Sequence, residues 1–273
     1  MTAKAFTRPL MYLILTVLSI LFLIPVYVVI VTSLKPLDEV TLAKMWALPT
    51  HIDFSSYAEA FSKLAPNFWN SVYLVIPATI LSAFLGSLNG YVLSKWRFKG
   101  ADWIFTAVLF GMFIPYQSIL IPLIRFLSHI GLYNTIPGLI LVHVVYGIPI
   151  TTLMFRNFYA SIPMEMIESA QIDGAGIFKI YRHIMIPLSL LGLVVVGIWQ
   201  FTNIWNEFLF AVTITTTDQH PIMVALQNLS GSQIVQWNVQ MAGAIIAALP
   251  TLLVYIFLGK FFVRGMLAGS VKG

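Results

Sequence analysis

The chain has 273 residues, of which 59% are hydrophobic and 9% are charged, and its mean hydropathy is +0.89. Soluble domains carry about 25% charged residues, so this composition excludes an ordinary soluble globular protein. The net charge of +5 comes from basic residues scattered at the ends of apolar runs, and without a basic stripe it does not indicate nucleic-acid binding. Because the chain has no cysteine, a disulfide framework, thiolate chemistry and a cysteine-based metal site are excluded.

Six apolar runs have about the 20 residues that a helix needs to cross the hydrocarbon layer. They cover residues 10–31, 72–93, 103–123, 136–155, 187–214 and 241–262. The runs lack the alternation of barrel strands, and lipid offers no water to an open sheet edge. The first run is longer than a signal-peptide core of about 7 to 15 residues, which predicts a retained anchor. The sequence therefore predicts an all-α integral membrane protein with about six transmembrane helices, a multi-pass protein of the cell membrane.

The distribution of lysine and arginine predicts the orientation in the membrane, because cytoplasmic loops carry an excess of these residues. With a cytoplasmic N-terminus, the inner side receives Lys4, Arg8, Lys95, Arg97, Lys99, Arg156, Lys179, Arg182, Lys260, Arg264 and Lys272. The outer side then keeps only Lys35, Lys44, Lys63 and Arg125. Both termini and the loop at 161–186 are therefore expected in the cytoplasm.

The first outer segment, residues 34–68, mixes charged and aromatic residues and is predicted to form a small extracytoplasmic cap. A helix is expected from Ser55 to Leu64, with Tyr57, Phe61 and Leu64 on one packing face at helical spacing.

The second, third and fourth spans contain residues that predict packing and bending. In the second, Gly86, Asn89, Gly90 and Ser94 are small or polar residues that let helices approach closely. In the third, Pro115 and Pro122 predict a kinked helix. In the fourth, His143 has no second histidine or carboxylate one turn away, so the sequence favours a packed, hydrogen-bonded residue over a metal ligand.

The interval from Pro163 to Pro187 is the long polar stretch between two apolar runs. Pro163 fits the first turn of a helix, acidic residues follow in that turn, and Asp173-Gly174 supplies a helix stop. A second short helix is expected to begin at Gly176 and to be interrupted at Pro187. The predicted shape is a helix, a tight glycine turn and a second helix.

This interval resembles the EAA loop of permease subunits of ATP-binding-cassette (ABC) importers. The matching positions are Glu168, Ser169, Ala170, Asp173, Gly174, Ala175, Tyr181 and Pro187. Ser169 stands where that family usually has alanine, and Gly176-Ile177 replaces a common Thr-Pro helix start. The resemblance implies a type I ABC importer transmembrane domain, whose coupling helix docks on a cytoplasmic ATPase subunit. The implied coupling residues are Glu168, Ser169, Ala170, Asp173, Gly174 and Ala175. The alternative is an ordinary amphipathic connector between two membrane helices.

The fifth span is the most polar of the six. Gln200, Asn203, Asn206 and Glu207 share one face at three- and four-residue spacing, and Trp205 lies among them. Amides match sugar hydroxyls and aromatic rings match pyranose faces, so a sugar path is one interpretation. Contact between helices is the equally weighted alternative for Asn206-Glu207. Glu207 lies about 20 residues, or near 30 Å, beyond Pro187, which favours the outer mouth and a gate or docking role.

Two later segments extend the resemblance. The outer helix expected at 221–229 presents Met223, Leu226 and Leu229, a contact for an extracytoplasmic partner that the resemblance implies is a solute-binding protein. The C-terminal tail at 264–273, ending in AGSVKG, is similar to that of carbohydrate permeases related to the second maltose permease subunit (carbohydrate uptake family 1). Other segments look similar to permeases for glucose or mannose.

The expected function is that of a permease subunit importing sugar by alternating access. The one Gly-Lys pair, Gly259-Lys260, lacks the spacing of a phosphate loop, so no enzyme activity is expected here and partner subunits are expected to bind ATP and Mg²⁺. The implied partners are two ABC ATPase subunits, a solute-binding protein and a second, different permease forming a heterodimer. An ABC permease for another solute and an ion-coupled secondary transporter are the alternatives, although secondary transporters use buried charge chains that Glu207 alone does not make.

Overall fold

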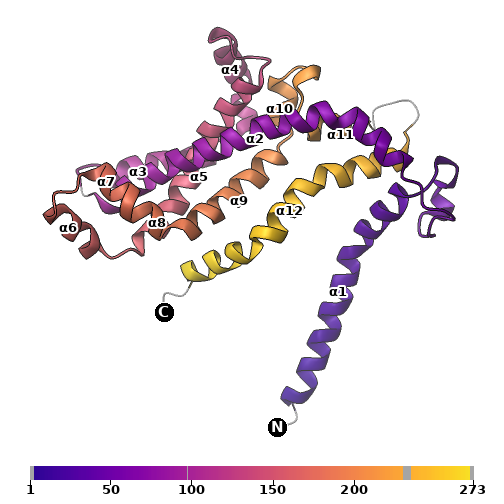
Figure 1. Cartoon of the computed structure of the whole chain (residues 1–273), viewed down its shortest axis with the longest axis horizontal. Helices are drawn as coiled ribbons and strands as arrows, with labels where there is room; N and C mark the ends of the chain where they lie inside the picture. Colours follow the sequence, from indigo (N-terminus) through magenta and orange to yellow (C-terminus); the bar gives the residue numbers. More distant parts are fainter. Residues whose placement is uncertain (1–2, 97, 230–234, 271–273) are drawn as a thin grey trace. The chain divides into compact units, whose positions relative to one another are not determined.

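The computed structural model describes residues 3–96, 98–229 and 235–270, and in these ranges the chain is helical, with no strand (Figure 1). The helices are α1 (Ala3–Ser33), α2 (Ser55–Lys95), α3 (Ala101–Phe110), α4 (Tyr116–His129), α5 (Ile136–Ala160), α6 (Met164–Ile172), α7 (Ile177–Ile180), α8 (Ile186–Leu188), α9 (Leu190–Trp205), α10 (Leu209–Ile214), α11 (Ile222–Leu229) and α12 (Trp237–Ser270). They form two compact units. The first comprises the chain up to Ala65 with Ala225–Leu249, and the second comprises Pro66–Val224 with the chain from Pro250.

Four helices of the described chain are long and apolar enough to cross a membrane. They are Arg8–Ser33, Ser55–Lys95, Ile136–Ala160 and Trp237–Phe262. Two bent pairs also qualify if each pair counts as one span, namely Ala101–Phe113 with Tyr116–His129 and Ile177–Leu188 with Leu190–Trp205. The six predicted apolar runs thus all fall on helices, but the third and fifth are not single straight helices.

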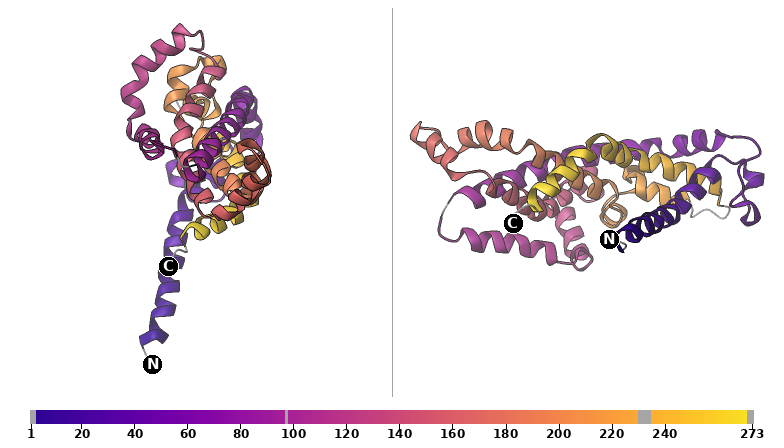
Figure 2. Two further views of the ribbon diagram at one scale, coloured as in Figure 1. Left: turned by 90° about the vertical axis from the view of Figure 1, so that its left-hand side faces the viewer. Right: turned by 90° about the horizontal axis from the view of Figure 1, so that it is seen from below.

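The third span breaks at Pro115, where the chain turns by 98° (Figure 2). Ile114 has φ −76° and ψ 114°, the extended conformation that a residue before proline favours. The predicted kink is confirmed, and Pro115 rather than Pro122 produces it, since Pro122 lies inside α4.

The fifth span is more broken than the sequence predicted, and its helical part begins at Ile177, before the predicted run. The helix expected to be interrupted at Pro187 continues through it to Leu188, because a proline removes only its own N–H donor. The chain turns by 79° at Ser189, and α9 then ends at Trp205 before the short helix α10. A π-helical turn, Tyr181–Met185, precedes α8. Such turns are uncommon in proteins, and those that occur are often found at functional sites.

The first unit corrects two predictions about the cap. The helix expected to end at Leu64 continues as the 41-residue helix α2, and Phe61 is 55% exposed rather than part of its packing face. The buried positions are Ser56, Ala60 and Leu64, one turn apart. Before α2, the Glu39 carboxylate accepts hydrogen bonds from the Thr50 amide and hydroxyl, which hold the pKa of Glu39 below its ordinary value.

Helices α11 and α12 carry the two remaining segments for which the sequence made predictions. Leu226 and Leu229 lie 3.1 and 3.5 Å from the position that a Cβ on Gly243 would occupy, and Leu64 lies 3.0 Å from it, so these two leucines pack against α12. Met223, Leu226 and Leu229 are each partly buried, and contact with a partner stays a prediction. The backbone of α12 continues to Ser270, and the side chains of the predicted 264–273 tail lie outside the described residues.

The second unit has α2, α5 and α9 packed closely through glycines. A Cβ on Gly86 of α2 would lie 2.1 Å from the Thr151 hydroxyl of α5, and one on Gly90 would lie 2.8 Å from the Arg156 backbone nitrogen. A Cβ on Gly147 of α5 would meet the Gln200 amide of α9 at 2.2 Å. The close approach predicted for Gly86 and Gly90 is confirmed, and small residues permit such contacts between membrane helices.

Gly86→Ala tests this packing. The added methyl group also lies 2.8 Å from the Thr151 carbonyl carbon, so the two helices must separate, at a cost of about 1–3 kcal/mol. We expect a lower melting temperature for the purified protein, measured as loss of the monodisperse peak in detergent. Gly197→Ala in α9 is the control, because no atom lies within 4 Å of its added Cβ. Equal melting temperatures for the two variants would contradict the packing.

Candidate functional site

Helix α6 and its C-terminal turn have the form that the sequence predicted. The helix starts after Pro163, ends at Ile172, and is followed by Gly174 with φ 77°. The Gly174 amide donates to the Gln171 carbonyl and the Ala175 amide donates to the Ala170 carbonyl, both at 2.9 Å. These two bonds are a Schellman motif, in which a left-handed residue follows the helix. Glycine adopts that conformation without strain, so the backbone at this position explains why the residue is a glycine.

The residues predicted to couple to an ATPase divide between two faces of this loop. Glu168, Ser169, Asp173 and Gly174 are exposed, while Ala170 and Ala175 are partly buried against a hydrophobic cluster. Two large apolar side chains, which the sequence analysis did not single out, are also exposed. Ile172 is 86% exposed at the end of α6, and Phe178 is 75% exposed on α7. The outer face therefore combines carboxylates with protruding apolar side chains.

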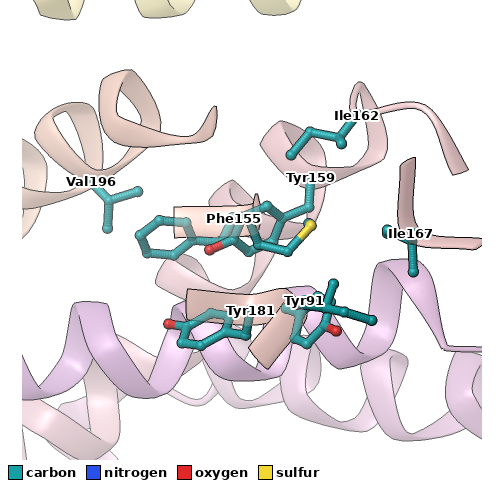
Figure 3. Close-up of a cluster of buried hydrophobic side chains, with 9 residues drawn as sticks. Tyr91, Phe155, Tyr159, Ile162, Ile167, Tyr181 and Val196 are labelled. Carbon is teal, nitrogen blue, oxygen red and sulfur yellow. The ribbon is translucent and has the colours of Figure 1, made fainter. Parts of the chain in front are cut away.

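The inner face of the loop belongs to an aromatic cluster in the second unit (Figure 3). Ile167 of α6 and Tyr181 of the π-turn are buried there with Tyr91 of α2 and with Phe155 and Tyr159 of α5. The Tyr91 and Tyr181 rings are stacked with centroids 5.5 Å apart, and those of Phe155 and Tyr159 are 5.7 Å apart. Offset aromatic stacking adds to the packing of such a cluster. The cluster joins the loop to two long membrane helices.

Hydrogen bonds fix the same joint from several sides. The buried Ser87 hydroxyl contacts the Tyr159 hydroxyl and lies 2.8 Å from the Tyr181 hydroxyl. The Tyr91 hydroxyl donates to the Ile177 carbonyl at 3.1 Å. The Lys95 ammonium group, at the end of α2, donates to the carbonyl of Ile162 just before α6. Because α2 contacts both ends of the loop, the loop and the membrane helices are held as one element.

Ile167→Ala tests this anchor. Truncating a fully buried isoleucine leaves a cavity and costs about 2–5 kcal/mol. We expect faster amide hydrogen exchange across residues 164–172, because α6 loses its one buried side chain. Met166→Ala, at a 42% exposed neighbour, is the matched control and should leave exchange unchanged. Identical exchange in both variants would show that Ile167 does not anchor the helix.

The break between α9 and α10 is stabilised by Glu207. Its carboxylate accepts hydrogen bonds from the backbone amides of Phe210 at 2.7 Å and Ala211 at 3.1 Å. These amides have no partner within α10, so the carboxylate caps the first turn of that helix. The side chain is thereby held at a fixed place beside the break.

A cavity of about 300 Å³ lies next to this break, within the second unit. Its lining residues are Tyr116, His143, Tyr146, Gly147, Trp199, Gln200, Asn203, Ile204, Glu207 and Phe210. Three of the predicted path residues, Gln200, Asn203 and Glu207, are thus brought together. The other two lie outside the lining. Asn206 is exposed and donates to the Thr202 carbonyl at 2.8 Å, and Trp205 is buried against Phe68, with ring centroids 5.6 Å apart.

The sequence around His143 suggested that this residue has no charged neighbour, but the structure gives it one. Its Nε2 lies 3.6 Å from a carboxylate oxygen of Glu207, and both side chains line the cavity. The sequence analysis searched for a carboxylate one turn away on the same helix, whereas the partner comes from beyond the end of α9. Only the packing of α5 against α9 and α10 brings the pair together.

Comparison with known proteins gives the class of this chain. Residues 78–268 match the family described as binding-protein-dependent transport system inner membrane component. The match covers more than half of the chain, and the chain belongs to this family of multi-pass membrane proteins. Its members are transport permeases and not catalytic enzymes.

Individual relatives agree with this membership. A probable ABC transporter permease protein of Pyrococcus horikoshii is 47% identical over 98% of both chains. The xylose/arabinose import permease protein of Haloferax volcanii is 34% identical, covering 90% of this chain and 87% of that protein. The glucose import system permease protein of Saccharolobus solfataricus is 32% identical, covering 96% and 95%.

A solved structure supports the fold. A bacterial ABC transporter involved in the import of the acidic polysaccharide alginate matches with a TM-score of 0.84 and 20% identity. The match covers 96% of this chain and 98% of that chain. The predicted all-α importer transmembrane fold is confirmed.

Proposed function

We propose that this chain is a permease subunit of an ATP-driven, binding-protein-dependent sugar importer and moves its substrate by alternating access. The observation that carries the proposal is the joint at Ile167 and Tyr181, which fixes an exposed helix to the membrane helices α2 and α5. A partner that moves α6 moves these helices with it. An exposed amphipathic connector would need no such joint.

The partner that moves α6 is an ABC ATPase subunit on the cytoplasmic side. Ile172 and Phe178 protrude from the loop and supply the apolar contacts that concentrate binding energy at an interface. Glu168, Ser169, Ala170, Asp173, Gly174 and Ala175 form the coupling residues, with the exposed ones facing the ATPase and the two alanines packing inward. The distribution of basic residues supports a cytoplasmic loop and cytoplasmic termini.

The broken fifth span provides the moving part. The π-turn, the 79° turn at Ser189 and the break capped by Glu207 are places where a helix can change direction without unfolding. ATP binding closes two motor subunits, the closure moves α6, and the segments on either side of Ser189 turn relative to each other. The ATPase can shift the equilibrium between the inward-open and outward-open states only by as much as its binding energy differs between them.

Sugars are the proposed substrate class. Relatives covering nearly all of the chain are named for xylose/arabinose and for glucose, so their names agree on sugars and differ on the sugar. A glucose- or mannose-like monosaccharide is our finer proposal, supported by the similarity of several segments to such permeases. A second permease in a heterodimer, two ATPases and a solute-binding protein complete the proposed complex.

Gly174→Val tests the proposed function through the coupling turn. Valine at φ 77° is strained by about 1–2 kcal/mol, so the Schellman turn opens and α6 no longer moves as one body. We expect the assembled complex in proteoliposomes to lose ATP-driven sugar uptake and stimulation of its ATPase by the binding protein.

Gly176→Val is the matched control for this experiment. Gly176 is two residues away and, like Gly174, has no atom within 4 Å of an added Cβ, but its φ is −75°. This variant should transport like the native chain. If Gly174→Val also retains uptake and stimulated ATPase activity, α6 does not couple ATP hydrolysis to transport.

A second pair of variants tests the substrate path. Asn203 and Asn206 each donate to the carbonyl four residues earlier, at 2.8 Å, but only Asn203 lines the cavity. Asn203→Leu should raise the KM of uptake about fivefold, the loss of roughly one hydrogen bond of about 1 kcal/mol. Asn206→Leu should leave KM unchanged at equal expression. An unchanged KM in both variants would show that the substrate does not pass through the cavity.

A further inference from the structure

The cavity beside the α9–α10 break contains two buried polar atoms that accept or donate no hydrogen bond within the described chain, although one of them lies 3.6 Å from the Glu207 carboxylate. His143 Nε2 and Gln200 Oε1 have no hydrogen-bond partner in the described part of the chain, and the two residues are 6% and 3% exposed. Buried polar atoms are nearly always hydrogen-bonded, so an unpaired pair in one cavity requires an explanation. Both residues line the same space, and a bound molecule that donates and accepts hydrogen bonds supplies the missing partners.

Aromatic side chains form much of the remaining wall. Tyr116 and Tyr146 lie with ring centroids 5.4 and 5.2 Å from that of Phe210, which also packs edge-on to His143 at 6.0 Å. Trp199 lies on the α9 side. Ligand pockets with a few placed polar groups begin at about 300 Å³, so the cavity suits one sugar ring better than a chain of them.

The charge of the lining is either negative or zero. Apart from tyrosine, its ionisable residues are Glu207 and His143, and no lysine or arginine is among the lining residues. The pair carries one negative charge when the imidazole is neutral and no net charge when it is protonated. An anionic ligand therefore meets no net positive charge in this lining, and a carboxylate brought next to the Glu207 carboxylate is repelled by it.

We propose that this cavity is a binding site for one ring of a neutral sugar and that Glu207 excludes carboxylated sugars from it. A ring hydroxyl donates to Gln200 Oε1, and a neighbouring hydroxyl on the cavity side bridges His143 Nε2 and the Glu207 carboxylate, which lie 3.6 Å apart. The inference rests on the proposed function and goes further in adding His143 to the site, removing Asn206 and Trp205 from it, and naming the charge class of the substrate.

Cysteine labelling tests this site directly, since the native chain has no cysteine. Asn203→Cys, placed in the lining, is compared with Asn206→Cys, placed outside it, in the reconstituted complex. Each is treated with a cationic trimethylammonium-ethyl and an anionic sulfonatoethyl methanethiosulfonate of similar size. We expect the cation-to-anion rate ratio to be about tenfold higher at position 203 than at 206, which corresponds to about 1.4 kcal/mol.

Two second-site variants assign the charge. Glu207→Gln keeps one oxygen to accept from α10 and removes the charge, so the ratio at position 203 should fall to within about twofold of that at 206. His143→Gln leaves the carboxylate in place and should keep or raise the ratio. Equal ratios at positions 203 and 206 in the otherwise native chain, or a ratio unaffected by Glu207→Gln, would overturn the proposal.

Protection by sugars tests the ligand class. D-glucose, D-mannose and D-xylose are each added before labelling of Asn203→Cys, and D-glucuronate is added at the same concentrations. At least one neutral sugar should slow labelling threefold or more, and glucuronate should not. Protection by no neutral sugar, or equal protection by glucuronate, would overturn the proposal. Labelling needs no ATP, so a failure of ATP-driven uptake is a separate result that contradicts the proposed function alone.

Discussion

Burial of Ile167 and Tyr181 among the aromatic side chains of α2 and α5 is the contact on which the rest of the second unit depends. It converts a short polar loop into the end of a membrane helix bundle. The Ser87 and Tyr91 hydroxyls and the Lys95 ammonium group satisfy polar atoms at the same joint, so a force on α6 is transmitted to α2 and α5. Packed interiors respond to such a force by moving as units, because they deform little.

The fifth span, in contrast to this rigid joint, is divided into short segments. Its π-turn, the turn at Ser189 and the break before α10 divide it into short segments, each stabilised locally. In the proposed mechanism, a rigid joint at the loop 161–186 is followed by a segmented helix, so movement occurs beyond the joint and not within it. The cavity lies at the far break, so the same segmentation that permits motion also opens room for a ligand.

The sequence predicted those features that depend on nearby residues. The bounds of α6, the positive φ of Gly174 and the helix break at Pro115 follow from turn and proline chemistry within a few positions. The helix expected to end at Leu64 continues through Pro66 as α2, and the break expected at Pro187 lies at Ser189 instead. A proline removes one N–H donor, so its presence alone does not decide where a helix ends. The pairing of His143 with Glu207 depends on the crossing of α5 with α9 and α10, and no local pattern contains it. The spacing of the polar residues placed Asn206 on the same helix face as the path residues. In the structure its side-chain amide donates a hydrogen bond to the Thr202 carbonyl of α9 and does not line the cavity.

The central claim is that α6 lies on the cytoplasmic side as the exposed end of a fixed joint, and its most direct test is the accessibility of Ile172. This side chain is 86% exposed, so Ile172→Cys gives a single reactive thiol in a chain without other cysteines. A membrane-impermeant maleimide should label it in inside-out vesicles and not in intact right-side-out vesicles. Labelling in right-side-out vesicles would place the loop on the outer side and contradict the account.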